Sequence, residues 1–176
     1  MRTWPRNGCD YAGQMPTLRN NVEMDAIDRK ILALLQDGGR LTITELAARI
    51  PLSVSRCQRR LRELEAEQVV RGYRADVDPA KVGLGFHALV FVTMAQVDRD
   101  TMARFEQAVA ALPEVVSADR LFGDPDYLLH VVAADLAGYQ RWYDLHAVVL
   151  PGVQRLNSTL VMKHVVRDRG LPITLT

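Results

Sequence analysis

The 176-residue sequence lacks several features that would mark a particular class of protein. Its two cysteines, Cys9 and Cys57, lie far apart and outside any Cys-x-x-Cys pair, so they indicate no disulfide scaffold and fit a reducing compartment. No apolar run approaches the roughly 20 residues that span a bilayer, and residues 1–23 have no apolar signal-peptide core. We therefore expect a cytoplasmic protein without a membrane partner.

Catalytic and metal-binding patterns are also missing. The four histidines show no His-x-x-His or His-Glu-x-x-His spacing; they are His87, His130, His146 and His164. No serine stands in a nucleophile elbow. We expect no metal, no cofactor and no enzymatic activity. Lys plus Arg is 22 against 21 for Asp plus Glu, so a nucleic-acid-binding surface would have to be local.

Composition divides the chain into five parts. Residues 1–23 are rich in Gly, Pro and Asn and are expected to form a disordered arm, or else to pack on the body. Residues 24–76 have helical periodicity, and 77–85 form a linker with Pro79, Gly83 and Gly85. Residues 86–166 alternate between strand and helix patterns, and 167–176 form a C-terminal tail.

Local signals predict three helices in residues 24–72. Asp25 is placed to cap the first, which Gly38 and Gly39 would end in a left-handed conformation. Thr42 and Glu45 form a capping box for a short second helix, and Ser53 would cap a third. A short helix, a tight connection and a third helix form a helix-turn-helix. The following residues, 69–75, are predicted to form a strand that serves as a small wing or a tether.

The third helix concentrates positive charge, with four arginines and no acidic residue between Ser53 and Arg62. Rotation by 100° per residue places Val54, Cys57, Leu61 and Leu64 on its core face and Arg59 opposite. We assign Ser55, Arg56 and Arg59 to base edges in the major groove of double-stranded DNA. Four arginines are assigned to DNA phosphates, namely Arg60, Arg62, Arg71 and Arg74. Ser53 and Gln58 complete the predicted interface.

Charged helix faces are usually only solvated, and it is the helix-turn-helix context that favours DNA here. Acidic residues follow at Glu63, Glu65 and Glu67, which confines the basic surface to the first turns of the helix. Cys57 is interpreted as a buried packing residue, with a redox role as the alternative.

Residues 86–166 predict the order β-α-β-β-α-β of a ferredoxin-like domain. The strands are expected at 86–97, 115–122, 127–134 and 153–166, with helices around 102–112 and 136–150. Both alternating sets of side chains in the first and third strands are apolar, for example Val90 and Leu89. A sheet with two apolar faces favours a homodimer, although a central strand that is simply buried would show the same pattern.

The turn from Gly123 to Tyr127 contains Asp124 and Asp126 beside a glycine. These carboxylates would suit an ammonium group, and exposed backbone amides would suit a carboxylate. The alternative is a hairpin built from turn-favouring residues.

Taken together, these segments resemble the Lrp/AsnC family of transcription regulators. The resemblance covers about 24–166 and rests on ordered motifs, which are MDAIDRKIL (24–32), ELA (45–47), LS (52–53), RRLRELE (59–65), RGYRA (71–75), DP (78–79), GLG (83–85), LPEV (112–115), GDPDYLL (123–129) and LPGV (150–153). It implies an α+β protein with an N-terminal winged helix-turn-helix and a C-terminal ferredoxin-like effector domain.

The resemblance also implies function and assembly. It implies a sequence-specific DNA-binding transcriptional regulator of the nucleoid, which forms homodimers and often octamers and responds to a small effector, usually an amino acid. The implied effector-binding residues are Gly123, Asp124, Asp126, Tyr127, Ser158 and Thr159.

Two residues depart from the family pattern. Gln68 stands where glycine is usual after the third helix, and a left-handed backbone there would cost about 1 kcal/mol. Pro51 replaces the usual glycine in the turn between the second and third helices.

Two other functions fit the same layout. Sirohaem decarboxylases share it, but the third helix here keeps its arginines, and no cluster of His and Arg lies between Val115 and Val132. An effector-binding protein without DNA activity would show a ligand-dependent melting shift and no retention of DNA.

Overall fold

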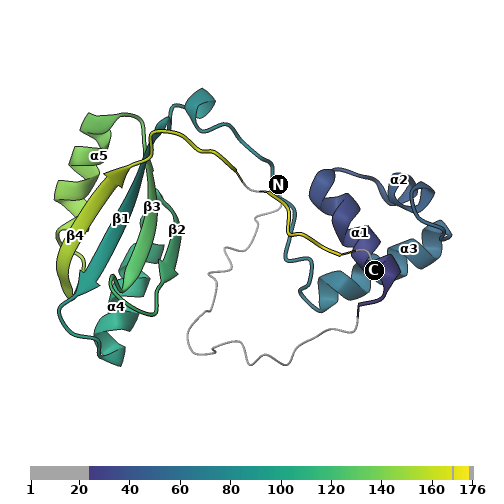
Figure 1. Cartoon of the computed structure of the whole chain (residues 1–176), viewed down its shortest axis with the longest axis horizontal. Helices are drawn as coiled ribbons and strands as arrows, with labels where there is room; N and C mark the ends of the chain where they lie inside the picture. The colour runs from purple at the N-terminus through teal and green to yellow at the C-terminus, as the bar shows by residue number, and fades with distance from the viewer. Residues whose placement is uncertain (1–23, 168, 175–176) are drawn as a thin grey trace, which may run out of the picture. The chain divides into compact units, whose positions relative to one another are not determined.

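The computed structural model describes residues 24–167 and 169–174, which form two compact units (Figure 1). One unit is Val77–His164; the other joins residues 24–76 to residues 165–174 from the end of the chain. The predicted disordered arm, 1–23, lies outside the described residues. Among the helices that are described, none is long and apolar enough to cross a membrane.

The N-terminal unit contains the three predicted helices, α1 (Ala26–Asp37), α2 (Ile43–Ala48) and α3 (Val54–Ala66). The Asp25 carboxylate accepts the amides of Ile27 and Asp28, each at 2.9 Å, and so caps α1. The Thr42–Glu45 capping box of α2 is formed as predicted. Ile31, Leu46 and Cys57 are fully buried, so one small core holds the three helices together.

Several local predictions in this unit are wrong. Gly38 ends α1 with φ −145°, which is not left-handed. Ser53 occupies the N-cap position of α3, but its side chain makes no capping hydrogen bond, and Val54 is 43% exposed rather than in the core. By contrast, the left-handed backbone considered at Gln68 is present, with φ 57° at this non-glycine residue.

The strand predicted at 69–75 does not form. The amides of Val69 and Val70 both donate to the carbonyl of Leu64, which closes the end of α3 instead. A strand exists only where its backbone groups pair with a neighbour, and no segment among residues 24–76, 165–167 and 169–174 is a strand that could pair with it. Residues 71–76 are exposed.

The C-terminal unit has the predicted β-α-β-β-α-β order. Its strands are β1 (Phe86–Met94), β2 (Val115–Arg120), β3 (Tyr127–Ala133) and β4 (Val153–Leu160), and its helices are α4 (Arg99–Ala110) and α5 (Leu136–Trp142). A 3₁₀ turn η1 (Ala80–Val82) precedes β1, and a π-helical turn η2 (Tyr143–Ala147) continues α5. The sheet is antiparallel in the order β2-β3-β1-β4.

The last strand is shorter than predicted. It pairs with β1 as far as Leu160, and one further bond joins the amide of Val161 to the carbonyl of His87. Because β1 begins at Phe86, β4 has almost no partner beyond this point, and residues 162–166 leave the sheet.

The two faces of the sheet differ. Val90, Val92 and Leu129 are fully buried in one core with Phe105 of α4 and Trp142 of α5, so the helices cover this face. On the other face Leu89 and Leu128 are half-buried without a helix above them. Pairing across the strands adds polar residues there, including Asn157 and Thr159 of β4.

Candidate functional site

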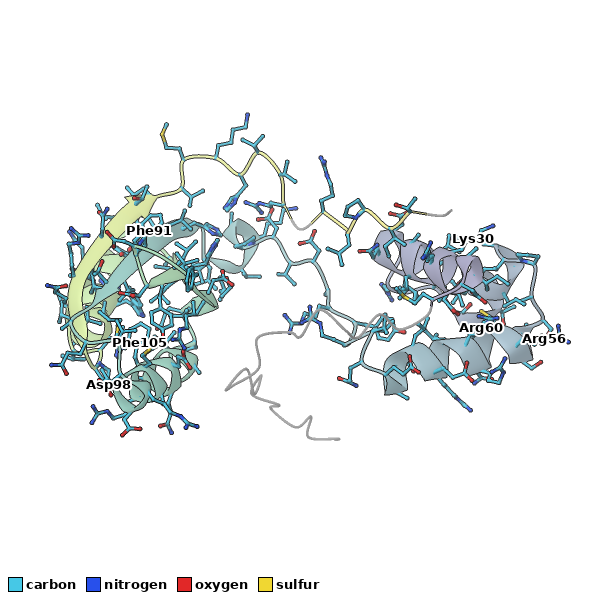
Figure 2. The ribbon with its side chains drawn as sticks, turned by 60° about the horizontal axis from the view of Figure 1, so that its bottom comes forward. Lys30, Arg56, Arg60, Phe91, Asp98 and Phe105 are labelled. Carbon is cyan, nitrogen blue, oxygen red and sulfur yellow. The ribbon has the colours of Figure 1, made fainter. Side chains whose placement is uncertain are left out.

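The outward face of α3 presents the predicted base-reading residues. Ser55, Arg56 and Arg59 are exposed, and so are Arg62 and Gln58 beside them. The opposite face is fixed by Cys57 and Leu64, which are 0% and 4% exposed. Figure 2 shows Arg56 projecting from the N-terminal end of α3. The helix is therefore held from one side and offers guanidinium groups on the other.

The N-terminus of α3 has no side-chain cap. The hydroxyl of Ser53 lies 3.3 Å from that of Ser55 instead of bonding a helix amide. No acidic residue occurs in the first turn. Amides and the helix dipole at such an end favour an anion, which suits a DNA phosphate.

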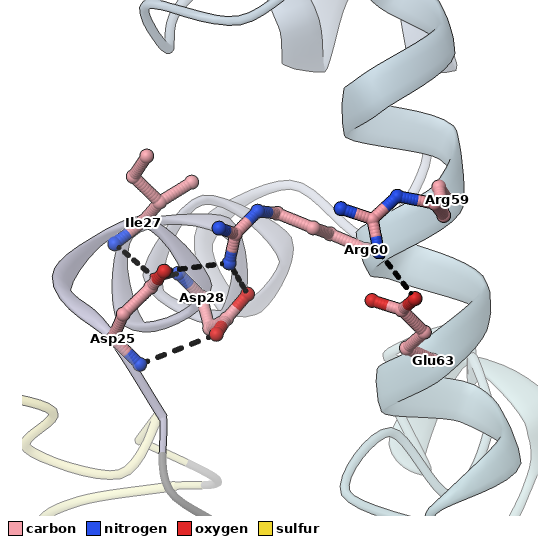
Figure 3. A network of polar contacts seen from close by, with 6 residues as sticks. All are labelled: Asp25, Ile27, Asp28, Arg59, Arg60 and Glu63. Carbon is pink, nitrogen blue, oxygen red and sulfur yellow. Dashed lines mark hydrogen bonds and ion pairs between the residues drawn. The ribbon is translucent and has the colours of Figure 1, made fainter.

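Arg60 has a different environment from its neighbours. Its guanidinium lies 2.7 Å from a carboxylate oxygen of Asp25 and 2.8 Å from one of Asp28, and its side chain is 24% exposed (Figure 3). Hydrogen bonds to Asp28 and Asp25 raise the pKa of Arg60. The Asp28 amide, assisted by Arg60, lowers the pKa of Asp25. This arginine, predicted as a phosphate contact, ties α3 to the start of α1.

Arg59 points along the helix surface in this structure. Its guanidinium lies 2.6 Å from the Glu63 carboxylate, and the side chains are 65% and 53% exposed (Figure 3). Exposed pairs of this kind contribute about 0–1 kcal/mol, so Arg59 can leave Glu63 for a stronger partner at small cost.

The segment after α3 carries the predicted phosphate-binding residues Arg71 and Arg74, both exposed. The Tyr73 hydroxyl between them donates to Glu65 at 2.9 Å. Partial burial and the Glu65 carboxylate raise the pKa of Tyr73 to about 12. The segment is thus attached to the last turns of α3.

Cys57 is fully buried, and burial raises the pKa of its thiol. A protonated, inaccessible thiol is unreactive, so the environment supports packing rather than redox sensing.

The C-terminal unit has an open hollow of about 290 Å³ on the face without helices. Its lining comes from the middle of the sheet, the 123–126 turn and β4, namely Phe91, Thr93, Asp124, Pro125, Arg155 and Asn157. Arg155 lies 3.9 Å from Asp124, and Thr93 donates to Asp124 at 3.4 Å. A cation, a carboxylate and an aromatic ring therefore meet in one hollow.

Only Asp124 among the six predicted effector residues lines this hollow. Asp126 has a structural role, because its carboxylate accepts a hydrogen bond of 2.7 Å from the Met94 amide. This bond lies at the point where the pairing of β1 with β4 shifts register. Tyr127 is 2% exposed and donates to Glu106 of α4 at 2.8 Å. Burial and Glu106 raise the pKa of Tyr127.

The remaining predicted residues are divided between the two faces. Ser158 pairs with Val90 and shares a hydrogen bond with the Tyr139 hydroxyl of α5, which places it on the helix side. Thr159 pairs with Leu89 on the open face. Gly123 is exposed with φ 145°, a backbone conformation that favours glycine.

Sequence reasoning missed the other residues that line the hollow. Arg155 and Asn157 lie four and two positions before Thr159, respectively, and alternation along the strand places all three on one face. That pattern could have identified them. Phe91 and Thr93 face the same hollow only because β1 pairs with β4 in this register, which no local signal specifies.

No group of three or more potential metal ligands occurs among residues 24–167 and 169–174. The rings of His87 and His164 pack edge to face with their centres 4.9 Å apart.

Each of the two units matches a known domain family. Residues 24–71 match the family model for winged helix-turn-helix DNA-binding domains, and 87–171 match that for the Lrp/AsnC ligand binding domain. The chain is 36% identical to the Bkd operon transcriptional regulator of Pseudomonas aeruginosa, over 86% of this chain and 99% of that protein.

Solved structures show the same similarity. A transcriptional regulator from Neisseria meningitidis in complex with L-methionine is 37% identical, with a TM-score of 0.80 over 85% of this chain and 96% of that chain. An AsnC family regulator from Agrobacterium tumefaciens is 34% identical, with a TM-score of 0.80 over 85% of this chain and 97% of that chain. The chain belongs to the Lrp/AsnC family of transcriptional regulators, with a helix-turn-helix DNA-binding domain and a ligand-binding domain.

Proposed function

We propose that this regulator recognises DNA sequence through the outward face of α3, and that an amino acid bound in the C-terminal domain changes its DNA binding. The observation that carries the first part is the exposure of Ser55, Arg56 and Arg59 on a helix whose other face is buried. A guanidinium group can donate two hydrogen bonds to guanine, which gives about 1–3 kcal/mol of discrimination.

The other predicted DNA-binding residues serve affinity in this proposal. Arg62, Arg71 and Arg74 are exposed and would neutralise phosphates, with Ser53 and Gln58 at the edge of the interface. Arg60 acts indirectly, because its guanidinium holds α3 against α1.

The proposed effector site is the hollow between Asp124 and Arg155. An amino acid carries an ammonium group for Asp124, a carboxylate for Arg155 and a side chain for Phe91. The Neisseria relative was solved with L-methionine, so this amino acid is the first probe. Gly123 and Thr159 complete the site from its rim, while Asp126, Tyr127 and Ser158 fix the turn and β4 in place.

We also propose that the protein works as a homodimer, and that dimers assemble into octamers. Leu89 and Leu128 on the face without helices favour association with a second copy, because apolar residues of a sheet are usually covered. A dimer would present two α3 helices to two half-sites. Since DNA is its partner, we place its action at the nucleoid, in the cytoplasm.

A gel-shift titration tests the DNA-binding residues. Arg59→Ala should lose discrimination between selected and unrelated sequences, whereas Arg71→Ala should weaken binding to all DNA alike and reduce the salt slope by about 1. If both variants keep wild-type specific binding, the proposed interface is wrong.

Calorimetry and DNA titration test the effector site. L-methionine should bind the wild-type protein and alter its apparent DNA Kd, by a coupling of about 1–3 kcal/mol. Arg155→Ala should abolish both effects, while Arg104→Ala, on the exposed surface of α4, should abolish neither. If Arg155→Ala still binds L-methionine, the proposed site is wrong.

The proposed dimer and octamer are tested by measuring the mass of the protein in solution by light scattering.

A further inference from the structure

The end of the chain returns to the DNA-binding unit. Gln36, near the end of α1, donates from its side-chain nitrogen to the carbonyl of Leu171 at 3.1 Å, across 135 positions of sequence. Its side-chain oxygen accepts the Leu171 amide in return. A side-chain amide that pairs with both backbone groups of one residue imitates a strand partner and recognises main chain rather than side chain.

Two neighbours of Leu171 support this contact independently. Gly170 lies so close to Gln36 that an added Cβ would be 3.2 Å from three of its side-chain atoms, a tight approach that glycine allows. Ile173 is partly buried and packs against the small core that contains Ile31 and Leu64. The side chain of Leu171 itself is 75% exposed, so its backbone makes the contact.

We propose that residues 170–173, which follow the effector domain in the chain, are a docking segment that holds α1, so that DNA binding depends on a segment distant from α3 in the sequence. Residues 161–169 connect β4 to this segment, and residues 77–85 connect the other end of the DNA-binding unit to β1. Two stretches of chain, 77–85 and 161–169, therefore run between the effector domain and the DNA-binding unit.

The route from the docking segment to the DNA-reading helix runs through α1. Gln36 lies in the last turn of α1, whereas Asp25 and Asp28 at its beginning hold Arg60 of α3. Ile31 in the middle of α1 shares a core with Cys57 of α3. A looser α1 therefore loosens the support that keeps the arginines of α3 in one orientation.

Two substitutions release the segment without touching the DNA-binding face. Gln36→Ala removes both hydrogen bonds while improving the helix propensity of α1, and Ile173→Ser removes the apolar contact. Leu171→Ala is the matched control in the segment, because it keeps the backbone that Gln36 binds. Asp37→Ala is the matched control on α1, since Asp37 is exposed and adjacent to Gln36.

The full-length protein is used, with amide hydrogen exchange of α1, DNA Kd without added ligand, and mass by light scattering. We expect Gln36→Ala and Ile173→Ser to speed exchange in α1 several-fold and to raise the DNA Kd about three- to tenfold at unchanged mass. Both controls should stay within about twofold of wild type.

The proposal is overturned if Gln36→Ala and Ile173→Ser bind DNA as the wild type does, even with faster exchange in α1. It is equally overturned if Leu171→Ala is as damaging as Ile173→Ser, or if the releasing substitutions change the mass, which would assign the segment to assembly. None of these outcomes depends on an effector, so they are separate from a failure of the proposed amino-acid site.

Discussion

The two units use polar side chains in opposite ways. In the DNA-binding unit most of the predicted contact residues, such as Arg56 and Arg59, stay exposed, while Arg60 is held by Asp25 and Asp28 of the fold. In the effector unit, by contrast, the motif residues Asp126 and Tyr127 are hydrogen-bonded within the fold, to the Met94 amide of β1 and to Glu106 of α4. A motif residue can thus serve the ligand directly or serve the backbone that meets it.

The difference follows from the size of the two cores. The effector unit has a four-stranded sheet covered by two helices, with Val90, Val92 and Leu129 fully buried. The three helices of the DNA-binding unit share a smaller core, and the ion pairs of Arg60 with Asp25 and Asp28 join α3 to α1. We therefore expect apolar truncation to damage the first unit most and loss of charge to damage the second.

The largest effect is expected for Phe105→Ala in the effector unit. Phe105 is 1% exposed and its ring centre lies 4.6 Å from that of Tyr127. Truncation leaves a cavity and should lower the free energy of unfolding by about 4 kcal/mol. Urea unfolding followed by Trp142 fluorescence, in a Trp4→Phe background, measures the loss. Hydrogen exchange in α1 should change little, and an equal loss of protection there would show that the units unfold together.

The next effect is expected for Arg60→Ala in the DNA-binding unit. It leaves the carboxylates of Asp25 and Asp28 without their cation and should reduce the stability of this unit by about 2 kcal/mol. The exposed Arg56→Ala on the same helix is the control, with a change within about 0.5 kcal/mol. Exchange of α1 and α3 amides reports both. If Arg60→Ala were as stable as Arg56→Ala, the polar support of this unit would be unimportant.

Much of the fold could be predicted because its signals are local. The caps at Asp25 and Thr42 need partners only three residues away, and the β-α-β-β-α-β order follows from alternation and helical period. The strand at 69–75 failed because a strand requires a partner, which β propensity does not supply. The left-handed conformation predicted at Gly38 after α1 did not form, whereas the one considered at Gln68 after α3 did, where the amides of Val69 and Val70 turn back to the Leu64 carbonyl.

The candidate sites were harder to predict, and for a related reason. Arg59 and Arg60 are chemically identical neighbours, and what separates them is Asp28, which lies 32 residues before Arg60 in the chain. The 123–127 turn was recognised correctly as a turn, but the pairing of Asp126 with Met94 depends on strand register. Residue type indicates the available chemistry, and long-range contacts decide which residue is free to use it.

A smaller effect, of opposite sign, is expected for Gln68→Gly. Gln68 has φ 57°, where an L-residue pays about 1 kcal/mol relative to glycine, so the substitution should stabilise the DNA-binding unit by up to that amount. The loss of the hydrogen bond from the Gln68 side chain to the Glu65 carbonyl, 3.1 Å and exposed, offsets little of it. Gln58→Gly, within α3, is the control and should destabilise. A Gln68→Gly protein less stable than wild type would contradict the strain argument.

The smallest effect is a difference in acid sensitivity between the units. The Asp28 amide with Arg60 lowers the pKa of Asp25, and the amide and hydroxyl of Thr42 lower that of Glu45. Folded-state values below the ordinary 3.8 and 4.5 mean that both groups stabilise the fold fully above those values. This stabilisation is lost as pH falls through the lower folded-state pKa.

Acidification below about pH 4 should therefore loosen α1 and α2 before the sheet, whose centre is apolar. Asn caps a helix almost as well as Asp but does not titrate. In Asp25→Asn, amide hydrogen exchange protection of α1 should therefore depend less on pH in the acid range. The Asp98 carboxylate caps α4, and the Thr101 amide lowers its pKa, so α4 provides an internal comparison on the apolar core. If α4 lost protection at a higher pH than α1, the polar caps would not be the weaker support, and the contrast between the units would fail.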